Sequence, residues 1–243
     1  DGGEVILNGD DNLLRNIQRE PSQKITYFGM RNPECDVRAM NVMQTPGLLS
    51  FGVTDGEHTI PVELALDGEH YVPDALAAIS VARALQVSPM DVYHRLANFR
   101  NLAGRQEIFE AKGYTIIKDC YNAGPESMAA ALNVLGKRPG RKIAVLGDML
   151  ELGICAQAEH YRIGRIAAEQ VDVVLAYGPN SSRIINGCLT GGMGSDRAMC
   201  FEDQNRLVTV LKRMAKPGDV ILFKGSHGMH MELALEAFLA EET

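Results

Sequence analysis

The end of one strand-like run places a carboxylate, a phenol and an amide close together in the chain. An apolar run ends at Asp119, Tyr121 and Asn122 follow in a polar turn, and Pro125 opens a helical pattern. Open α/β sheets bind ligands where a strand ends and a helix begins. Asp119 could therefore accept a hydrogen bond from a ribose hydroxyl or a ligand amine. It could also cap the loop or the next helix, as short polar side chains do at such positions.

Other strand ends and one linker position carry polar or charged groups that could bind a ligand. Arg105 could bind a phosphate through two hydrogen bonds, or it could be a solvated linker residue. Asp148 follows a strand-like run in a Gly-Asp turn, which is either a ligand contact or an ordinary loop. Lys224 and Ser226 follow another such run and, with the first N–H groups of the next helix, could hold a carboxylate or phosphate. The alternative is that Ser226 is a plain N-cap.

The elements that must position these side chains alternate regularly in the second half of the chain. Strands are expected at residues 114–117, 142–146, 171–176, 197–201 and 220–223, and helices at 125–135, 159–169, 181–188, 203–214 and 226–240. Repeated strand–helix units predict an α/β fold with a mostly parallel sheet and helices on both faces.

The first half of the chain has a less regular pattern. Strands are expected at residues 4–8, 24–28, 37–40, 48–53 and 59–64, a hairpin turn at 55–57, and helices at 12–19, from 73 and from 89. This pattern predicts an α+β arrangement with antiparallel pieces. A polar break at residues 98–104 indicates a domain boundary at about residue 105.

The composition excludes several classes of function. The 243 residues carry a net charge of −7 without a dense Lys/Arg run, so we expect no nucleic-acid binding. Five cysteines without a Cys-x-x-Cys pair predict a reduced, cytoplasmic protein with no metal site. No apolar run approaches the ~20 residues of a transmembrane helix, so we expect no membrane insertion. The chain opens on Asp1 rather than Met, which leads us to expect a fragment of a longer protein.

Taken in order, these residues resemble the Mur ligase family. The segments that carry the resemblance are Asp119-Cys120-Tyr121-Asn122-Ala123 with Pro125 and Ser127-Met128, the run from Ile143 to Gly153 followed by His160 and Gly164, and Lys224-Gly225-Ser226 with Gly228-Met229. The resemblance covers the whole chain, and the Gly-Asp-Met-Leu-Glu-Leu-Gly run at 147–153 is quite specific. Within the family, the pattern is most similar to the branch that adds D-alanyl-D-alanine to UDP-N-acetylmuramoyl-tripeptide.

The resemblance implies a fold, an activity and a set of ligands. Residues 105–243 would be a Rossmann-like C-terminal domain, and residues 1–104 the later part of a central ATP-binding domain. The full-length enzyme would use ATP and Mg²⁺ to form an amide through an acyl phosphate, in the synthesis of peptidoglycan precursors. No Gly-x-x-x-x-Gly-Lys-Ser/Thr loop occurs in this chain. We therefore expect the fragment alone to be inactive, with no catalytic residue and no metal ligand of its own.

The resemblance also implies which residues face ATP. Arg105 would face the ATP phosphates and Asp119 the ribose. Tyr121 and Asn122 would line the entrance of the same ATP site. These four residues lie within 18 positions of one another in the sequence, from 105 to 122.

Further positions are expected at the adenine and at the incoming dipeptide. Two family asparagines that contact adenine are replaced here by Tyr71 and Asp74, and Asp74 could instead be the N-cap of its helix. Asp148, Lys224 and Ser226 would lie on the side of the amino substrate.

Two alternatives stay open. Another amide ligase with the same C-terminal module, such as a folylpolyglutamate or cyanophycin synthetase, would share much of the pattern, although the run at residues 147–153 argues against it. A non-catalytic nucleotide- or dipeptide-binding module is the other alternative. It is motivated by Tyr71, Asp74 and Gly124, which depart from the family pattern.

Overall fold

The chain divides into two compact units, Asp1–Arg100 and Asn101–Thr243. The computed structural model describes residues 3–18, 22–56 and 58–240. Each unit has its own sheet and its own hydrophobic core. Residue 19, at the end of the first expected helix, and residue 57, in the expected hairpin turn, lie outside the described residues.

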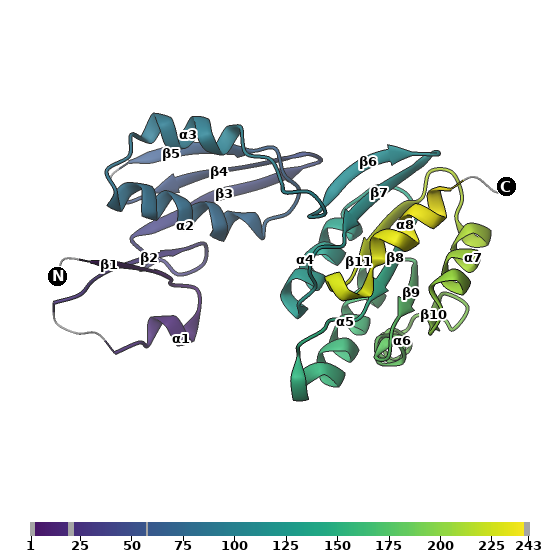
Figure 1. The fold of residues 1–243 in the computed structure, drawn as a ribbon. Helices are drawn as coiled ribbons and strands as arrows, with labels where there is room; N and C mark the ends of the chain where they lie inside the picture. The colour runs from purple at the N-terminus through teal and green to yellow at the C-terminus, as the bar shows by residue number, and fades with distance from the viewer. Residues whose placement is uncertain (1–2, 19–21, 57, 241–243) are drawn as a thin grey trace. The chain divides into compact units, whose positions relative to one another are not determined.

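The second unit is built on a six-stranded sheet in the order β10-β9-β8-β11-β7-β6 (Figure 1). Its strands are β6 (Glu107–Ala111), β7 (Tyr114–Asp119), β8 (Lys142–Gly147), β9 (Val173–Tyr177), β10 (Ala198–Phe201) and β11 (Val220–Lys224). All neighbours run parallel except β6 and β7. The mostly parallel sheet predicted from the alternating pattern is confirmed.

Strand β6 was not expected from the sequence. It forms a hairpin with β7 across Lys112 and Gly113, which have φ angles of 51° and 80°. Two successive residues with positive φ make the tight turn whose twist matches that of the two strands. The Lys-Gly pair between two short apolar runs was the available signal.

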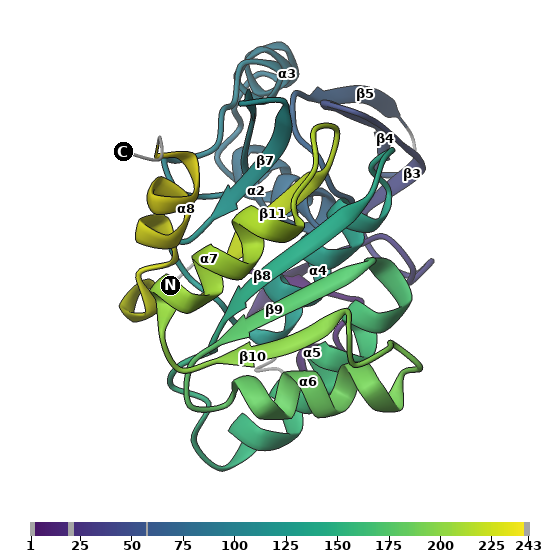
Figure 2. The same cartoon turned by 90° about the vertical axis from the view of Figure 1, so that its right-hand side faces the viewer.

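Helices cover both faces of this sheet. They are α4 (Pro125–Gly136), α5 (Ala156–Gln170), α6 (Ser181–Thr190), α7 (Gln204–Met214) and α8 (Met231–Leu239). Helices α4, α5 and α6 pack on one face and α7 and α8 on the other (Figures 1 and 2). Successive strand side chains point to opposite faces. Ile117 therefore joins the core under α4–α6, whereas Ile116 joins the core under α7 and α8.

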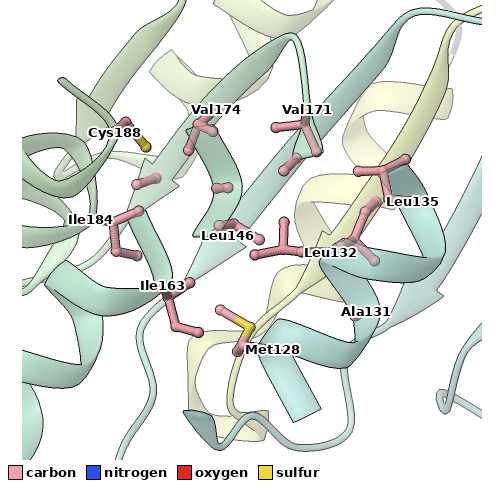
Figure 3. Packing of buried hydrophobic residues seen from close by; sticks show 14 of the residues in the cluster. Met128, Ala131, Leu132, Leu135, Leu146, Ile163, Val171, Val174, Ile184 and Cys188 are labelled. Carbon is pink, nitrogen blue, oxygen red and sulfur yellow. The ribbon is translucent and has the colours of Figure 1, made fainter. Parts of the chain in front are cut away.

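The core under α4–α6 is made of aliphatic side chains that interdigitate between the helices and the sheet. Figure 3 shows Met128 and Leu132 of α4 and Ile163 of α5 meeting Leu146 and Val174 of the strands. All five are fully buried, at 0% exposure. Burying an aliphatic side chain of this size stabilises the fold by about 1.5–3 kcal/mol. This face of the sheet is therefore a rigid base for the loops at the strand ends.

Helices α5 and α6 pack closely at a pair of glycines. A Cβ atom added to Gly164 would lie 1.9 Å from the backbone oxygen of Ile184, and one added to Gly187 would lie 2.1 Å from that of Tyr161. No other residue fits at this distance, so the two glycines set the spacing of the helices.

The last helix begins later than the sequence indicated. It was expected from Ser226, but α8 begins at Met231. A 3-10 turn over His227–Met229 comes first, and His230 then has a left-handed backbone with φ 50° and ψ 44°. This conformation interrupts the helical path. The N–H groups that follow Ser226 therefore belong to a single 3-10 turn, and the expected continuous helix from Ser226 is wrong.

The first unit contains a mixed five-stranded sheet in the order β1-β2-β3-β4-β5. Its elements are β1 (Glu4–Asn8), α1 (Asn12–Arg15), β2 (Lys24–Gly29), β3 (Val37–Thr45), β4 (Leu48–Thr54), β5 (Thr59–Leu64), α2 (Tyr71–Ala84) and α3 (Pro89–Ala97). β1, β2 and β3 pair in parallel, whereas β3, β4 and β5 pair antiparallel. The expected antiparallel pieces are confirmed.

Asp10 organises the loop that follows β2. Its carboxylate accepts hydrogen bonds from the backbone N–H groups of Met30 (2.7 Å), Arg31 (3.0 Å) and Asn32 (2.8 Å). Burial by itself would raise the pKa of Asp10, but the three N–H donors together hold it below its ordinary value. The turn after β1 is thus tied to the turn after β2.

Candidate functional site

The candidate site lies at the carboxyl ends of three adjacent strands of the second unit. In the sheet register, Lys224 at the end of β11 lies opposite Asp119 of β7 on one side and Leu146 of β8 on the other. Parallel strands end at the same edge of a sheet, so three sequence-distant turns meet there. Ligands of open α/β sheets bind at this edge.

Lys224 and Asp119 form an ion pair. Lys224 Nζ lies 2.7 Å from Asp119 Oδ2 and donates a second hydrogen bond to the backbone oxygen of Asn122 at 3.0 Å. The side chains of Lys224 and Asp119 are 2% and 14% exposed. A charge held this far from water is costly unless it is paired and hydrogen-bonded. The pair therefore joins the ends of β7 and β11 firmly.

Arg105 and Tyr121 lie together on the surface beside this pair. The Arg105 guanidinium carbon is 4.4 Å from the centre of the Tyr121 ring. The backbone oxygen of Gly104 accepts hydrogen bonds from the N–H groups of Cys120 (3.0 Å) and Tyr121 (3.2 Å). These bonds hold the segment before β6 against the turn after β7. Arg105, Tyr121 and Asn122 are all exposed. Asn122 Oδ1 accepts a hydrogen bond from the backbone N–H of Ala123 at 2.8 Å, so Asn122 offers a ligand its amide NH2 group.

Ser226 connects all three turns. Its Oγ accepts a hydrogen bond from the backbone N–H of Leu150 at 2.9 Å and donates one to the backbone oxygen of Ala123 at 3.3 Å. Its own N–H donates to the backbone oxygen of Asp148 at 3.1 Å. Ser226 occupies the N-cap position of the 3-10 turn at His227–Met229, but its side chain makes no capping bond there. It instead links the loops that follow β7, β8 and β11.

Asp148 is the buried centre of a second polar cluster. Asp148 Oδ2 accepts hydrogen bonds from Asn180, one from the backbone N–H and one from Nδ2, both at 2.9 Å. Asp148 Oδ1 is buried and has no hydrogen-bond partner among the residues described. It lies 3.7 Å from Nε2 of His160. Asp148 as a whole is only 1% exposed.

His160 holds the turn that contains Asp148. Its Nε2 accepts a hydrogen bond from the backbone N–H of Met149 at 2.9 Å, and its Nδ1 lies 2.6 Å from the backbone oxygen of Ala156. These partners assign the proton to Nδ1. Nε2 then has no hydrogen to donate to Asp148 Oδ1, which explains why that oxygen is left without a partner.

Burial changes the chemistry of Cys120, which lies next to Asp119. Desolvation, followed by the negative charges of Glu232 and Asp119, raises the pKa of Cys120 to about 12. Its Sγ donates a hydrogen bond to the backbone oxygen of Phe223 at 3.4 Å. A thiol in this state is a poor nucleophile, so Cys120 has a packing role.

The structure brings together seven of the nine sequence-predicted site residues within the second unit. The residues gathered there are Arg105, Asp119, Tyr121, Asn122, Asp148, Lys224 and Ser226. The other two, Tyr71 and Asp74, belong to α2 of the first unit. The Tyr71 ring centre lies 4.2 Å from that of His70.

Asp74 does not cap its helix. Helix α2 begins at Tyr71, which puts Asp74 inside the first turn, and the N-cap is His70. The N-cap alternative is therefore wrong, although a carboxylate in the first turn still interacts favourably with the helix dipole. Desolvation raises the pKa of Asp74, partly offset by His70, while its side chain keeps contact with solvent.

Two residues of the site were missed or misjudged from the sequence. His160 was noted in the sequence only as part of the family pattern and given no place in the site, but it is fully buried. It shares one helical face with Ile163, Gly164 and Ala167, and this spacing was the signal for its burial. Asn180 was not singled out, because nothing local relates it to Asp148, 32 positions earlier.

Neither a metal-binding cluster nor a membrane-spanning helix occurs within the residues that the structure describes. In those ranges, His, Cys, Asp and Glu side chains form no group of three or more that could hold a metal ion. None of the helices there has the length and apolar character needed to cross a bilayer.

Comparison with known proteins identifies the family. The sequence profile described as "Mur ligase, glutamate ligase domain" matches residues 104–227, just over half of the chain. The chain belongs to the Mur ligase family. The matched range contains the turns after β7, β8 and β11, so the candidate site of this Mur ligase chain lies within it.

Individual relatives match nearly the whole chain. The UDP-N-acetylmuramoyl-tripeptide–D-alanyl-D-alanine ligase of Bacillus subtilis is 33% identical over 235 residues, which cover 95% of this chain and 50% of the relative. The ligase of the same name from Escherichia coli is 32% identical over 242 residues, covering 98% and 52%. This Mur ligase chain thus spans about half the length of the curated relatives it matches.

Solved structures agree with the fold. A crystal structure of MurF from Acinetobacter baumannii superimposes with a TM-score of 0.87 at 29% identity and covers 98% of this chain and 52% of that one. The MurF ligase of Thermotoga maritima, solved in complex with ADP, gives a TM-score of 0.80 at 25% identity and covers 97% and 52%. The Rossmann-like fold expected for the second half of this Mur ligase chain is confirmed.

Proposed function

We propose that this chain is the C-terminal half of an ATP-dependent ligase that joins D-alanyl-D-alanine to UDP-N-acetylmuramoyl-tripeptide in peptidoglycan precursor synthesis. One observation carries the proposal: ligases of that name match at least 95% of the chain at 32–33% identity. Residues 1–104 would be the later part of the central ATP-binding domain, and residues 105–243 the C-terminal domain. The enzyme would work in the cytoplasm.

The proposed reaction has two steps. The terminal carboxylate of the tripeptide attacks the γ-phosphorus of ATP, which forms an acyl phosphate and releases ADP. The amine of D-alanyl-D-alanine then attacks the acyl carbon, loses a proton, and expels inorganic phosphate from the tetrahedral intermediate. Mg²⁺ would offset negative charge on the transferring phosphoryl group.

The nucleotide-side residues fit the ATP assignment. Asp119 Oδ2 is paired with Lys224, whereas no hydrogen bond within the described residues reaches Oδ1. A ribose hydroxyl can donate to that oxygen. Arg105 presents an exposed guanidinium held on the ring of Tyr121, suited to an ATP phosphate. Asn122 adds an exposed side-chain amide beside them.

On the amino-substrate side, we propose that Asp148 and Ser226 act by holding the strand-end turns. Both are buried and both have partners within the chain. Binding the dipeptide in a closed, water-poor site would protect the acyl phosphate from hydrolysis. The rigid turns would supply the walls of that site.

The 243 residues alone would not catalyse. They contain no Gly-x-x-x-x-Gly-Lys-Ser/Thr loop to hold the ATP phosphates. The expected result for the isolated chain is therefore no ADP release with any combination of the three substrates.

The test uses the full-length protein that contains this chain. Purified protein is incubated with ATP, Mg²⁺, UDP-N-acetylmuramoyl-tripeptide and D-alanyl-D-alanine, and ADP and the pentapeptide product are measured. We expect continued, multiple-turnover ADP production to require both the tripeptide and the dipeptide, because the acyl phosphate must be consumed before the next turnover. Turnover with a folyl substrate and glutamate instead would favour the folylpolyglutamate type of ligase. Nucleotide binding without any turnover would favour a non-catalytic binding module.

A matched pair of variants sharpens this test. Arg105→Lys keeps the charge but loses the planar two-bond geometry, so the KM for ATP should rise about tenfold. Arg138→Lys, two residues beyond the C-terminal end of α4, should leave the KM for ATP unchanged. Equal behaviour of the two variants would remove Arg105 from the phosphate contacts.

A further inference from the structure

The structure joins two residues that the sequence assigned to different substrates. Asp119 was expected to face the ATP ribose and Lys224 the amino substrate. Lys224 Nζ instead lies 2.7 Å from Asp119 Oδ2, although the two residues are 105 positions apart in the chain. Both are the last residues of their strands, β7 and β11, and they are register neighbours.

Lys224 has little freedom to bind a ligand itself. Two of its three ammonium hydrogens are directed at Asp119 Oδ2 and the backbone oxygen of Asn122. The residue is 1% exposed. The third hydrogen has almost no access to solvent, so the ammonium would have to leave its buried, hydrogen-bonded ion pair to reach an incoming dipeptide, which is strongly unfavourable.

Both hydrogen bonds of the Lys224 ammonium go to residues that are proposed to bind the nucleotide. Its bond to Asp119 Oδ2 fixes the rotamer of the carboxylate and leaves Oδ1 as the oxygen open to a donor. Its bond to the Asn122 oxygen fixes the backbone of the turn that carries Tyr121 and Asn122. Removing the ammonium would release both the carboxylate and the turn.

We propose that Lys224 is a positioning residue for nucleotide binding. It orients Asp119 toward the ribose and holds the 120–122 turn, and it does not bind the D-alanyl-D-alanine substrate. This inference rests on the proposed function, since it presumes that Asp119 contacts the ribose.

The decisive experiment measures ribose discrimination in the full-length protein. The dissociation constants of ADP and 2′,3′-dideoxy-ADP are determined by calorimetry with Mg²⁺ present. In the wild type, loss of the ribose hydroxyls should weaken binding about tenfold, because a carboxylate acceptor is left without its donor. In Lys224→Met, ADP should bind about tenfold more weakly and the two nucleotides should differ by less than about twofold.

A matched control separates this effect from a general loss of charge. Lys142 lies at the opposite end of the same sheet, at the start of β8, where its Nζ donates to the backbone oxygen of Gly140 at 2.9 Å. Lys142→Met should keep the wild-type discrimination between the two nucleotides.

A second variant distinguishes a loss of nucleotide positioning from a loss of folding. Lys224→Met leaves the Asp119 charge unpaired in a buried position, which could lower the melting temperature. The double variant Lys224→Met/Asp119→Asn removes that charge and should melt at a higher temperature than Lys224→Met. It should still bind both nucleotides equally, because neither the ammonium nor the carboxylate remains.

Specific outcomes would overturn the inference. If folded Lys224→Met keeps the wild-type preference for ADP, Lys224 does not position Asp119. If the double variant keeps that preference, Asp119 is not the ribose acceptor and the inference fails at its premise. If Lys224→Met raises the KM for D-alanyl-D-alanine and leaves nucleotide binding unchanged, Lys224 belongs to the amino-substrate side. A wild type without ribose discrimination would reject the inference as well.

These outcomes are distinct from failure of the proposed function. A wild-type protein that binds ADP with ribose discrimination but does not join the dipeptide to the tripeptide would reject the ligase assignment and leave the role of Lys224 intact.

Discussion

Asp148 and Asn180 are joined by two hydrogen bonds to a single oxygen. Asp148 Oδ2 accepts from both the backbone N–H and the Nδ2 of Asn180, at 2.9 Å each. The carboxylate is almost completely buried, and its other oxygen has no partner within the described part of the chain. Asn180 therefore provides the hydrogen bonds that make this buried charge tolerable. The contact ties the turn after β8 to the start of α6.

Removing the Asn180 side chain should destabilise the second unit. Asn180→Ala deletes one hydrogen bond to a buried carboxylate, which is expected to cost about 1.5–3 kcal/mol. Native-state hydrogen exchange of the β8 amides measures the free energy of unfolding of this unit. The control is Asn186→Ala, an exposed position in the same helix, which should change it by less than about 0.5 kcal/mol. Equal effects would show that the Asp148 contact is energetically unimportant.

A glycine-to-alanine change at Gly164 should be harmful despite the higher helix propensity of alanine. The added Cβ would lie 1.9 Å from the backbone oxygen of Ile184. Alanine gains about 1 kcal/mol in propensity. Forcing α5 and α6 apart should outweigh this and give a net loss of about 1–3 kcal/mol. Thermal unfolding followed by circular dichroism measures the change.

The control for this prediction is Gly3→Ala. Gly3 is exposed, lies outside any helix or strand, and an added Cβ would meet nothing within 4 Å. Its melting temperature should match the wild type. A Gly164→Ala variant as stable as Gly3→Ala would contradict the close crossing of the two helices.

The cysteines should differ sharply in reactivity. Cys155 and Cys200 are exposed, whereas Cys35, Cys120 and Cys188 are buried. Burial raises the pKa of both Cys120 and Cys188 to about 12, and desolvation also raises that of Cys35. Because the thiolate is the reactive form, an aromatic disulfide reagent at pH 8 should modify two thiols rapidly in the folded protein. All five should react in denaturant, and fast reaction of a third thiol without denaturant would argue against this burial.

The carboxylate of Asp10 should make the stability of the first unit depend on pH. Its folded-state pKa lies below the ordinary value of 3.8 because three N–H groups donate to it. A depressed pKa contributes stability that is present above the unfolded-state pKa and is lost as the pH falls through the folded-state pKa. Asp10→Asn should therefore cost about 1–2 kcal/mol at pH 7, and the difference from wild type should shrink below pH 4.

The pH effect is measured by urea unfolding of both proteins between pH 7 and pH 3. Glu63→Gln serves as control, because Glu63 is exposed on β5, outside any helix turn, and should show little difference at any pH. A constant difference between wild type and Asp10→Asn across this range would rule out the charged form of Asp10 as the source of the stability.

Much of the architecture could be predicted because its signals are local. The apolar runs that end at Asp119, Gly147 and Lys224 are strands in the structure. Local patterns were less informative about where individual helices and strands begin and end. The expected helix start at Ser226 failed because His230 adopts a left-handed backbone between two helical pieces. Strand β6 was missed because it is short and only partly buried, so its apolar pattern is weak.

The sequence by itself determined the strand ends, the polar residues at them and the family, since periodicity and motif order belong to the chain. The partners of those residues were decided only by the tertiary structure. Asp119 meets Lys224 because β11 lies next to β7 in the sheet, and Asp148 meets Asn180 because β8 lies next to β9. Strand order results from packing α4–α6 and α7–α8 on opposite faces, which no local pattern encodes. As a result, Asp119 and Lys224, which the sequence predicted as contacts for two different substrates, form one ion pair.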